Sequence, residues 1–247
     1  MNHSSSRFRS RFRLPATAVC AALAAATVPV NAAIPYGPSP YLAFDNTLTG
    51  AGLSISPFAG QSFTSFYLET FEDGLLNTLG VSANAGNLRV GAYTDSVDAD
   101  DGVIDGSGSA GRSWGFGSGS SGITFTFNAG LLGSLPTHVG IVWTDGSGTV
   151  TFEAFGPGNS LLGTIVGSGF ADAGHFGGTA EDRFFGISDV GGIASIRISN
   201  TLGGIEVDHL QYGLESTSAV PEPSTYAAGL AVLGAVGGVW WRRRRRA

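Results

Sequence analysis

Short runs of alternating apolar and polar residues, each bounded by turn-forming residues, fill the middle of this 247-residue chain. In the run from Ile123 to Phe127, the isoleucine and both phenylalanines fall on one face and two threonines on the other. A period of two is typical of a strand with one buried face, because successive side chains of a strand point to opposite sides. The middle region contains no convincing helical period. The alternation therefore predicts an all-β domain.

Turn residues separate these runs at short intervals. Glycine accounts for 39 of the 247 residues and is concentrated in the links, where tight turns require positive φ angles. Eight or more short strands joined in this way predict a two-sheet antiparallel sandwich of the jelly-roll type. A longer glycine- and serine-rich stretch, 106–122, is expected to form a flexible surface loop. Further strands are expected over 61–69, 88–93, 139–143, 150–154, 161–166, 183–187, 196–198 and 205–207.

Charge is divided between the ends and the middle of the chain. All 13 basic residues are arginines, and nine of them lie in the first 13 or the last six positions. Between residues 33 and 219, four arginines oppose 18 carboxylates, which leaves this region at −14. A body of this charge repels phosphate backbones, so nucleic acid is not an expected partner.

The first 32 residues have the features of a secretory signal peptide. Four arginines over 7–13 precede an apolar stretch at 14–30, and Val30 and Ala32 suit the −3 and −1 positions of a cleavage site. We therefore expect export by the Sec machinery and cleavage after Ala32. The alternative is a membrane-spanning helix, which Pro15 and Pro29 disfavour.

The predicted signal peptide contains the only cysteine of the chain, Cys20. The exported domain, expected to span 33–214, would then have no thiol and no disulfide. Its stability must come from its core, assisted by a metal ion if one is bound.

The C-terminal region, 215–247, combines a stalk with a weak membrane anchor. An apolar run at 226–241 would span about 24 Å as a helix, which is shorter than the usual hydrocarbon core of about 30 Å. The aromatic pair that ends this run suits a membrane interface, and the arginines after it should stay cytoplasmic. The motif before the run is Val220, Pro221, Glu222 and Pro223, and the membrane stop is Trp240, Trp241, Arg242, Arg243, Arg244, Arg245 and Arg246.

The order of motif, span and basic stop over about the last 28 residues resembles the PEP-CTERM sorting signal of bacterial surface proteins. The resemblance implies a temporary inner-membrane anchor that an exosortase-type transpeptidase cuts near the Pro-Glu-Pro motif. A permanent C-terminal anchor is the alternative. Such tails also carry the name "ice-binding protein C-terminal" domain, which describes the tail and not the ligand of the body.

Three segments of the body, YLETFEDG, GTAEDRFFGI and GGIEVDHLQYG, resemble extracellular jelly-roll modules of PEP-CTERM proteins and carbohydrate-binding modules. In such modules an early Phe-Glu and a late Val-Asp often meet around a structural Ca²⁺. The resemblance implies this role for Glu72 and Asp208, whereas the alternative is two surface carboxylates on neighbouring strands.

Five carboxylates within eleven residues form a second candidate calcium site. Ca²⁺ takes six to eight oxygen ligands from flexible loops, and a divalent ion would relieve the repulsion between close carboxylates. The spacing does not fit an EF-hand, and a solvated acidic turn would explain the same residues without a metal. The residues are Asp95, Asp98, Asp100, Asp101 and Asp105.

Catalytic motifs are not evident. His138, His175 and His209 lack metal-protease or zinc-finger spacing, and there is no Gly-x-Ser-x-Gly elbow. Structural roles are expected for these histidines. Trp114 could stack on a sugar ring if it is exposed, or could pack over the end of the sandwich.

The sequence thus predicts an exported, non-enzymatic surface or extracellular-matrix protein that is anchored transiently in the inner membrane. One alternative is a carbohydrate-binding module that attaches to exopolysaccharide. A small secreted hydrolase is a further, less favoured alternative.

Overall fold

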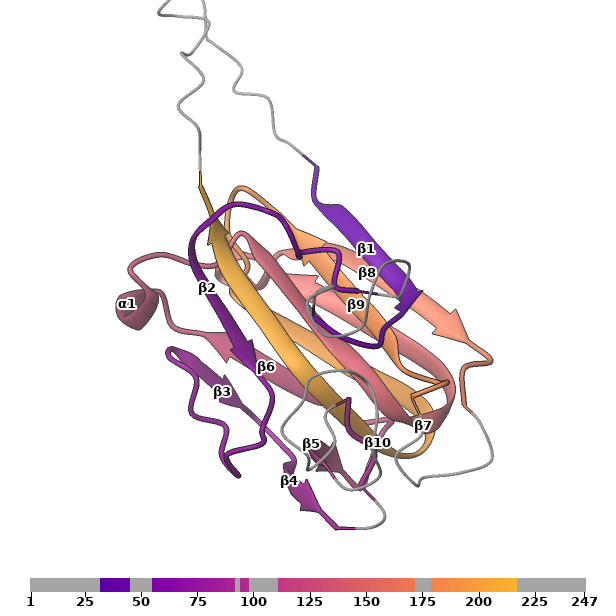
Figure 1. Cartoon of the computed structure of the whole chain (residues 1–247). Helices are drawn as coiled ribbons and strands as arrows, with labels where there is room; N and C mark the ends of the chain where they lie inside the picture. Colours follow the sequence, from indigo (N-terminus) through magenta and orange to yellow (C-terminus); the bar gives the residue numbers. More distant parts are fainter. Residues whose placement is uncertain (1–31, 45–54, 92–93, 98–110, 172–178, 217–247) are drawn as a thin grey trace, which may run out of the picture. The chain divides into compact units, whose positions relative to one another are not determined.

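Antiparallel β-strands make up nearly all the regular structure of the described residues, as the computed structural model in Figure 1 shows. It describes residues 32–44, 55–91, 94–97, 111–171 and 179–216, all within the unit Asn31–Ala247. The predicted signal peptide up to residue 31, the sorting tail from 217 onward and residues 98–110 lie outside the described residues. Among the described residues, no helix is long and apolar enough to cross a membrane.

Ten strands and two very short helices occur in the described ranges. The helices are α1 (Ala129–Leu132) and the 3-10 helix η1 (Pro157–Asn159). The strands are β1 (Ile34–Pro40), β2 (Phe63–Glu69), β3 (Val81–Ala83), β4 (Asn87–Val90), β5 (Arg112–Phe116), β6 (Ile123–Phe127), β7 (His138–Phe155), β8 (Leu161–Ser168), β9 (Arg183–Ser188) and β10 (Ser195–Glu215).

The two long strands, β7 and β10, pair with each other from end to end and belong to both layers of a sandwich. The first half of β7 and the second half of β10 lie in one layer, with the order β1-β9-β7-β10-β2. The other halves lie in the second layer, with the order β8-β7-β10-β6-β3. We call these layers the first and the second. The hairpin of β4 and β5 joins β10 at Ile205–Val207.

Glycines and one buried asparagine produce the bend between the layers. Gly148 has a φ of 86° and Gly203 a φ of 71°, values that favour glycine. Asn200 is 1% exposed, and its side-chain amide donates to the carbonyls of Ser147, Leu202 and Gly204. The amide thus satisfies backbone acceptors that the bend removes from the regular ladder.

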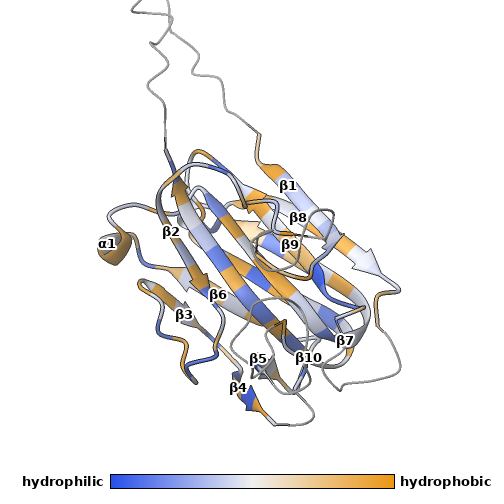
Figure 2. Ribbon diagram, in the orientation of Figure 1, coloured by the Kyte–Doolittle hydropathy of each residue, from blue (hydrophilic) through white to orange (hydrophobic). Residues whose placement is uncertain are grey.

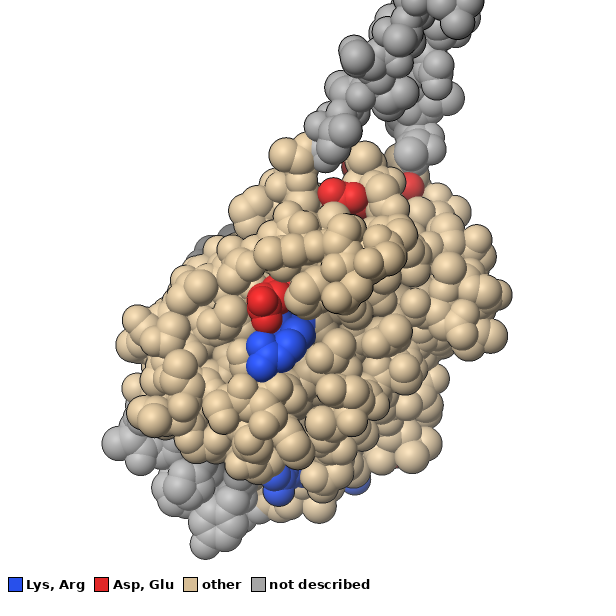
Figure 3. Space-filling view, turned by 180° about the vertical axis from the view of Figure 1, so that it is seen from behind, with Lys and Arg blue, Asp and Glu red and all other residues tan. Residues whose placement is uncertain are grey.

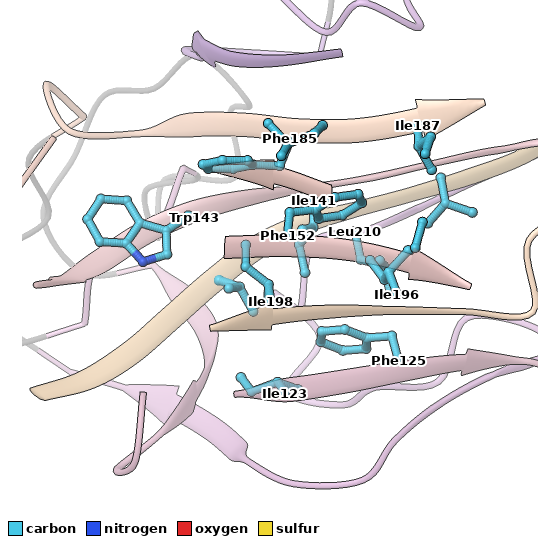
Figure 4. Close-up of a cluster of buried hydrophobic side chains, with 14 of the residues drawn as sticks. Ile123, Phe125, Ile141, Trp143, Phe152, Phe185, Ile187, Ile196, Ile198 and Leu210 are labelled. Carbon is cyan, nitrogen blue, oxygen red and sulfur yellow. The ribbon is translucent and has the colours of Figure 1, made fainter. Parts of the chain in front are cut away.

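The main hydrophobic core lies between the two layers. Alternate residues of the long strands point into it, and Figure 2 shows the alternation of hydrophobic and hydrophilic residues along β7 and β10. Figure 4 shows side chains from both layers meeting there, among them Phe152 of the second layer and Phe185 of the first. These two rings stack with centroids 6.3 Å apart. Trp143 is 1% exposed and belongs to this core.

The outer face of the first layer is also covered. Phe184 and Val142 point away from the main core and pack with Tyr41, Phe58 and Val97, which come from segments outside the strands. Segments 41–44, 55–62 and 94–97 therefore form a cover over the first layer. Since both faces are buried, β9 has no exposed residue and lacks a clean alternation.

The predicted all-β antiparallel sandwich is confirmed, with differences in detail. Its layers are not two separate sheets, because both long strands run through the bend and join them. The loop predicted over 106–122 is wrong at 112–116, which forms β5. Strands β1 and β3 were not predicted. The sequence of β1, IPYGPSP, looks unlike a strand, but prolines are tolerated in an edge strand, and β1 pairs only with β9.

Candidate functional site

Buried carboxylates gather at one end of the first layer. Asp182 lies directly before β9, Asp208 lies within β10, and Asp95 belongs to the covering segment 94–97. These three side chains are 0–1% exposed, and so is that of Glu181. Four carboxylates buried this deeply need compensation, because desolvating a charged group is costly. We call Asp95, Glu181, Asp182 and Asp208 the carboxylate cluster.

On the outer face of the second layer, the residues that the structure describes form no comparable cluster of buried carboxylates. Arg197 and Glu153 form an ion pair there, with 2.9 Å between Nη1 and Oε2, on the outer face of the second layer. Figure 3 shows that this side carries few charged side chains. A partly exposed pair of this kind contributes little to stability.

Protein donors bind both carboxylate oxygens of Asp208. Oδ2 accepts from Ser96 Oγ and from the backbone N–H of Val97, each at 2.9 Å, and Oδ1 accepts from the N–H of His209 at 2.7 Å. Ser96 Oγ also lies 3.5 Å from Oε1 of Glu72. The structure thus brings Glu72 and Asp208, which the sequence paired, to the same serine. Their role as calcium ligands stays a prediction.

Asp182 and Asp95 differ from Asp208, because some of their carboxylate oxygens accept no hydrogen bond from the described residues. Neither Oδ1 nor Oδ2 of Asp182 has a hydrogen-bond partner among the described residues, and neither has Oδ1 of Asp95. Burial raises the pKa of Asp182 well above its usual value, and the negative charges of Asp95, Asp208 and Glu181 raise it further. The nearby charge of Arg183 acts in the opposite direction.

Burial also raises the pKa of Asp95, to about 9, followed by the effects of Glu181, Asp145 and Glu206. A side-chain hydrogen bond with Glu181 contributes to the same shift. Two carboxyl groups can share such a bond only if one of them carries a proton.

The Glu206 side chain fixes the position of the Asp95 backbone. Its Oε2 accepts from the backbone N–H of Asp95 at 3.0 Å and from Ser113 Oγ at 2.7 Å. Thr144 Oγ1 donates to the carbonyl of Asp95 at 2.9 Å. The covering segment is thus bound to β7 and β10 by side chains, which holds Asp95 next to the strand ends.

A strained histidine borders the cluster. His209 is fully buried and has a φ of 43°, an uncommon conformation for a residue other than glycine. Its Nδ1 lies 2.8 Å from the hydroxyl of Tyr41, which also accepts from Nε2 of Gln211. Ser56 Oγ donates to Oε1 of Gln211. This network attaches the cover to β10 beside Asp208.

The sequence located only part of the cluster. Asp95 and Asp208 were singled out for separate sites, and the structure brings both near Asp182. Glu181, Asp182 and Glu206 were missed, although an acidic pair directly before a buried strand was a usable signal. Asp98, Asp100, Asp101 and Asp105 lie outside the described residues. Within the described ranges, no group of three or more His, Cys, Asp or Glu side chains is arranged so that it could hold a metal ion.

Trp114 lies in β5 and is half-buried, so its predicted position in a flexible loop is wrong. The indole stacks on Phe71, with centroids 5.8 Å apart, and its Nε1 donates to the carbonyl of Ala85 at 2.9 Å. Gly86 leaves room for the ring, since a Cβ there would lie 2.5 Å from Nε1. These contacts are those of a packing residue, and they leave sugar binding by Trp114 a prediction.

A cleft lies at the other end of the first layer, where β1 begins and β10 ends. Its volume is about 380 Å³, and hydroxyl, amide, imidazole and carboxylate groups line it together with apolar side chains. His138 is 4% exposed, and burial lowers the pKa of its imidazole. The lining residues are Ala32, Ile34, Tyr36, Gln61, Thr137, His138, Ser188, Asp189, Val190 and Glu215.

No protein-family model and no curated protein matches this chain. Among solved structures, a family 6 carbohydrate-binding module shares 18% identity with it, covers 62% of this chain and 94% of its own, and has a TM-score of 0.32. The enzymatically active domain of tailspike protein 4 from bacteriophage CBA120 shares 13% identity, covers 66% of this chain and 22% of its own, and has a TM-score of 0.34. Likeness at these TM-scores is too low to assign a fold or a ligand to this chain.

Proposed function

We propose that this chain is an exported, non-enzymatic surface or matrix protein that is tethered from one end of its sandwich and presents the other end outward. The observation that carries the proposal is the position of the two chain ends. Ile34 at the start of β1 pairs with Ser188, which pairs with His138, and His138 pairs with Gly213 near the end of β10. Figure 1 shows both ends of the described chain on this side.

The carboxylate cluster lies at the far end of the same strands. Arg183, which follows Asp182, pairs with Pro40 and Trp143, and Trp143 pairs with Val207 beside Asp208. A tether at either chain end would therefore leave the cluster directed away from the membrane.

The sequence supports the finer steps of this proposal. The signal peptide would bring the chain to the Sec machinery, and the tail at 226–246 would hold it briefly in the inner membrane. An exosortase-type transpeptidase would then cut near Pro221 and Pro223 and deliver the body to the cell surface or the extracellular polysaccharide.

Strand order supports the finer prediction of a jelly roll. In the first layer the order β2-β10-β7-β9 joins strands distant in sequence, and the second layer has the matching order β6-β10-β7-β8. The chain crosses between the layers from β2 to β6, within β7, from β8 to β9 and within β10. Such repeated crossing is how a double Greek key closes a sandwich.

Mass spectrometry of the native protein tests the processing steps. We expect an N-terminus at Ala33 and a C-terminus upstream of Tyr226, in a product that is recovered outside the inner membrane. When Pro221, Glu222 and Pro223 are all replaced by alanine, we expect the mature protein to keep its C-terminal tail. The control Glu215→Gln should lose the tail as wild type does. A mature wild-type product that still ends in Arg242–Arg246 would show a permanent anchor instead.

The polar cleft favours carbohydrate binding as a second candidate function. Hydroxyl and amide groups of Tyr36, Gln61 and Thr137 offer the hydrogen bonds that a saccharide needs, and the tyrosine ring adds apolar surface. Two carboxylates, Asp189 and Glu215, line the same cleft, which favours a neutral or amine-bearing sugar over an acidic one.

A glycan array probed with the full chain tests this second candidate. We expect binding to neutral or amine-bearing glycans that survives high salt, and a loss of at least about tenfold in affinity for Gln61→Ala, since about 1.4 kcal/mol corresponds to tenfold. Ser118→Ala, on the surface beyond β5, is the control and should bind as wild type. An array without specific binding would remove this candidate, and glycan turnover would indicate a hydrolase.

A further inference from the structure

The cleft where β1 begins carries negative charge that the side chains lining it do not balance. Asp189 and Glu215 line it, no arginine does, and neither carboxylate takes part in an ion pair among the described residues. Burial lowers the pKa of His138, so the imidazole in this cleft is uncharged at neutral pH. The whole chain contains no lysine. A cation that neutralises the cleft therefore has to come from another source than these side chains.

The pairing of β1 with β9 places the backbone of Ala33 beside Asp189. Ile34 lies opposite Ser188, so the same antiparallel register puts Ala33 opposite Asp189. Residues that face each other in an antiparallel pair have Cα atoms about 4.5–5.5 Å apart. Ala32 lines the cleft and Ala33 packs against the main core, which holds this part of the chain at the edge of the cleft. The backbone nitrogen of Ala33 is thus within reach of the Asp189 carboxylate.

Hydrogen bonds hold both acidic residues in position. Oδ1 of Asp189 accepts from the backbone N–H of Gly191 at 2.7 Å, and the N–H of Asp189 donates to the carbonyl of Thr137 at 2.8 Å. The N–H of Glu215 donates to Oγ1 of the same threonine at 2.9 Å. Thr137 thus fixes the backbones of both acidic residues at one point. A site that is ordered in advance binds a cation at little entropic cost.

We propose that the α-ammonium group of Ala33 binds to Asp189 and Glu215 in this cleft, an arrangement that rests on the proposed signal-peptide cleavage after Ala32. In the precursor the Ala33 nitrogen belongs to a peptide bond and is uncharged. Hydrolysis adds the hydroxyl of water to the Ala32 carbonyl carbon and a proton to the Ala33 nitrogen, which takes up the proton that the new carboxylic acid releases. The resulting ammonium group has an ordinary pKa of about 7.7–8.0. Nearby carboxylates stabilise its charged form.

The ion pair fastens a weakly supported strand in the mature protein. β1 pairs only with β9, and its three prolines donate no backbone hydrogen bonds to that pairing. A charge fixed at Ala33 adds an attachment at the start of this edge strand, next to the end of β9. The precursor lacks this attachment, so cleavage completes the cleft as well as releasing the chain.

The α-amino group of the mature chain can be labelled alone, because a protein without lysine has no other primary amine. Reductive methylation of the native protein with ¹³C-formaldehyde introduces the label, and the pH dependence of its ¹³C NMR signal gives the pKa. We expect a pKa about 1 unit higher in the folded protein than in the same labelled chain unfolded in urea. Asp189→Asn should remove at least about half of this difference. The control Glu153→Gln changes a charge on the outer face of the second layer and should leave the difference unaltered.

Acetylation of the same amine tests the contact through stability. The acetylated wild type should melt at a lower temperature than the unmodified protein, because the acetyl group removes the charge. Acetylation should leave the Tm of Asp189→Asn nearly unchanged, since the partner of the ammonium is already lost. Glu215→Gln serves in the same way if Asp189→Asn does not fold. Equal losses of Tm in wild type and variant would overturn the proposal, as would a folded-state pKa at or below the unfolded value.

The N-terminal sequence of the native protein separates the ion pair from the processing on which it rests. A native N-terminus other than Ala33 would contradict the proposed cleavage site. The pKa would then be measured on the full chain in detergent, with a protease recognition sequence placed directly before Ala33 so that cleavage in vitro generates the same terminus. An ordinary pKa at a correctly cut Ala33 would contradict the ion pair and leave the proposed processing intact.

Discussion

Replacing Phe152 by alanine is expected to destabilise the protein by about 3–5 kcal/mol, the usual cost of removing a fully buried phenylalanine. Phe152 is 0% exposed, pairs with Ile198 in the second layer and stacks on Phe185 of the first. The substitution would leave a cavity between the layers that neither can close alone. This loss is a large share of the free energy of unfolding of a native domain, which is about 5–15 kcal/mol. Urea unfolding of the full chain, with Ca²⁺ present throughout, measures it.

Val166→Ala is the matched control for the core prediction. Val166 lies on β8 of the same layer but is 57% exposed, so its truncation should change the free energy of unfolding by less than about 0.5 kcal/mol. Similar losses for the two variants would contradict a core between the layers at Phe152.

The metal-free protein is expected to lose stability as the pH rises. The pKa of Asp95 is about 9 in the folded protein against an ordinary value of 3.8, chiefly because the group is buried and then because Glu181, Asp145 and Glu206 surround it. Between these values the folded protein keeps a proton that the unfolded chain releases. Stability therefore falls through this window, by up to about 1.4 kcal/mol per pH unit for each such group. Asp182, whose pKa is raised in the same direction, adds to the fall.

Denaturant unfolding in EDTA at pH 5 and pH 8 measures this effect. Wild type should be less stable at pH 8, and Asp95→Asn should reduce the difference, because the amide does not ionise. Lowering the pH below 6.5 has an opposite effect through His138, because burial lowers the pKa of its imidazole and the unfolded chain then binds a proton that the folded protein does not. Equal stability at the two pH values in EDTA would count against buried, proton-holding carboxylates.

Alternation of side chains was enough to predict the strands that have one face in the core. The runs at Ile123–Phe127 and Val150–Ala154 carry this pattern, and both lie in strands of the second layer. The pattern could not show that two predicted strands are halves of β7, since the bend at Gly146 and Gly148 resembles a turn in sequence. Strand β5 was hidden by its glycines and serines, whose strand conformation is imposed by pairing with β4 and β10.

Prediction of the site failed where it depended on distant parts of the chain. Asp95 and Asp182 are 87 positions apart, and the pairing of β9 with β7 and the cover from segment 94–97 bring them together. Composition marks a run of neighbouring acids, whereas the pair Glu181-Asp182 is marked only by its place before a buried strand, and the depth of its burial follows from tertiary structure. For the same reason Trp114, which looked available for stacking, proved to be held by Phe71 and Ala85.

The continuous course of β10 has a mechanical consequence. Its last residues, Leu214 and Glu215, pair with β2 at the end from which a C-terminal tether would pull, and its Val207–Asp208 segment lies at the end that carries the carboxylate cluster. A load between the cell surface and a partner at that far end would run lengthwise along β10. The hydrogen bonds to β2 and β7 would then be loaded in shear, all at the same time. A force perpendicular to the strand would instead break these bonds one after another. Under the proposed tether, tension would run along this strand and load its hydrogen bonds in shear.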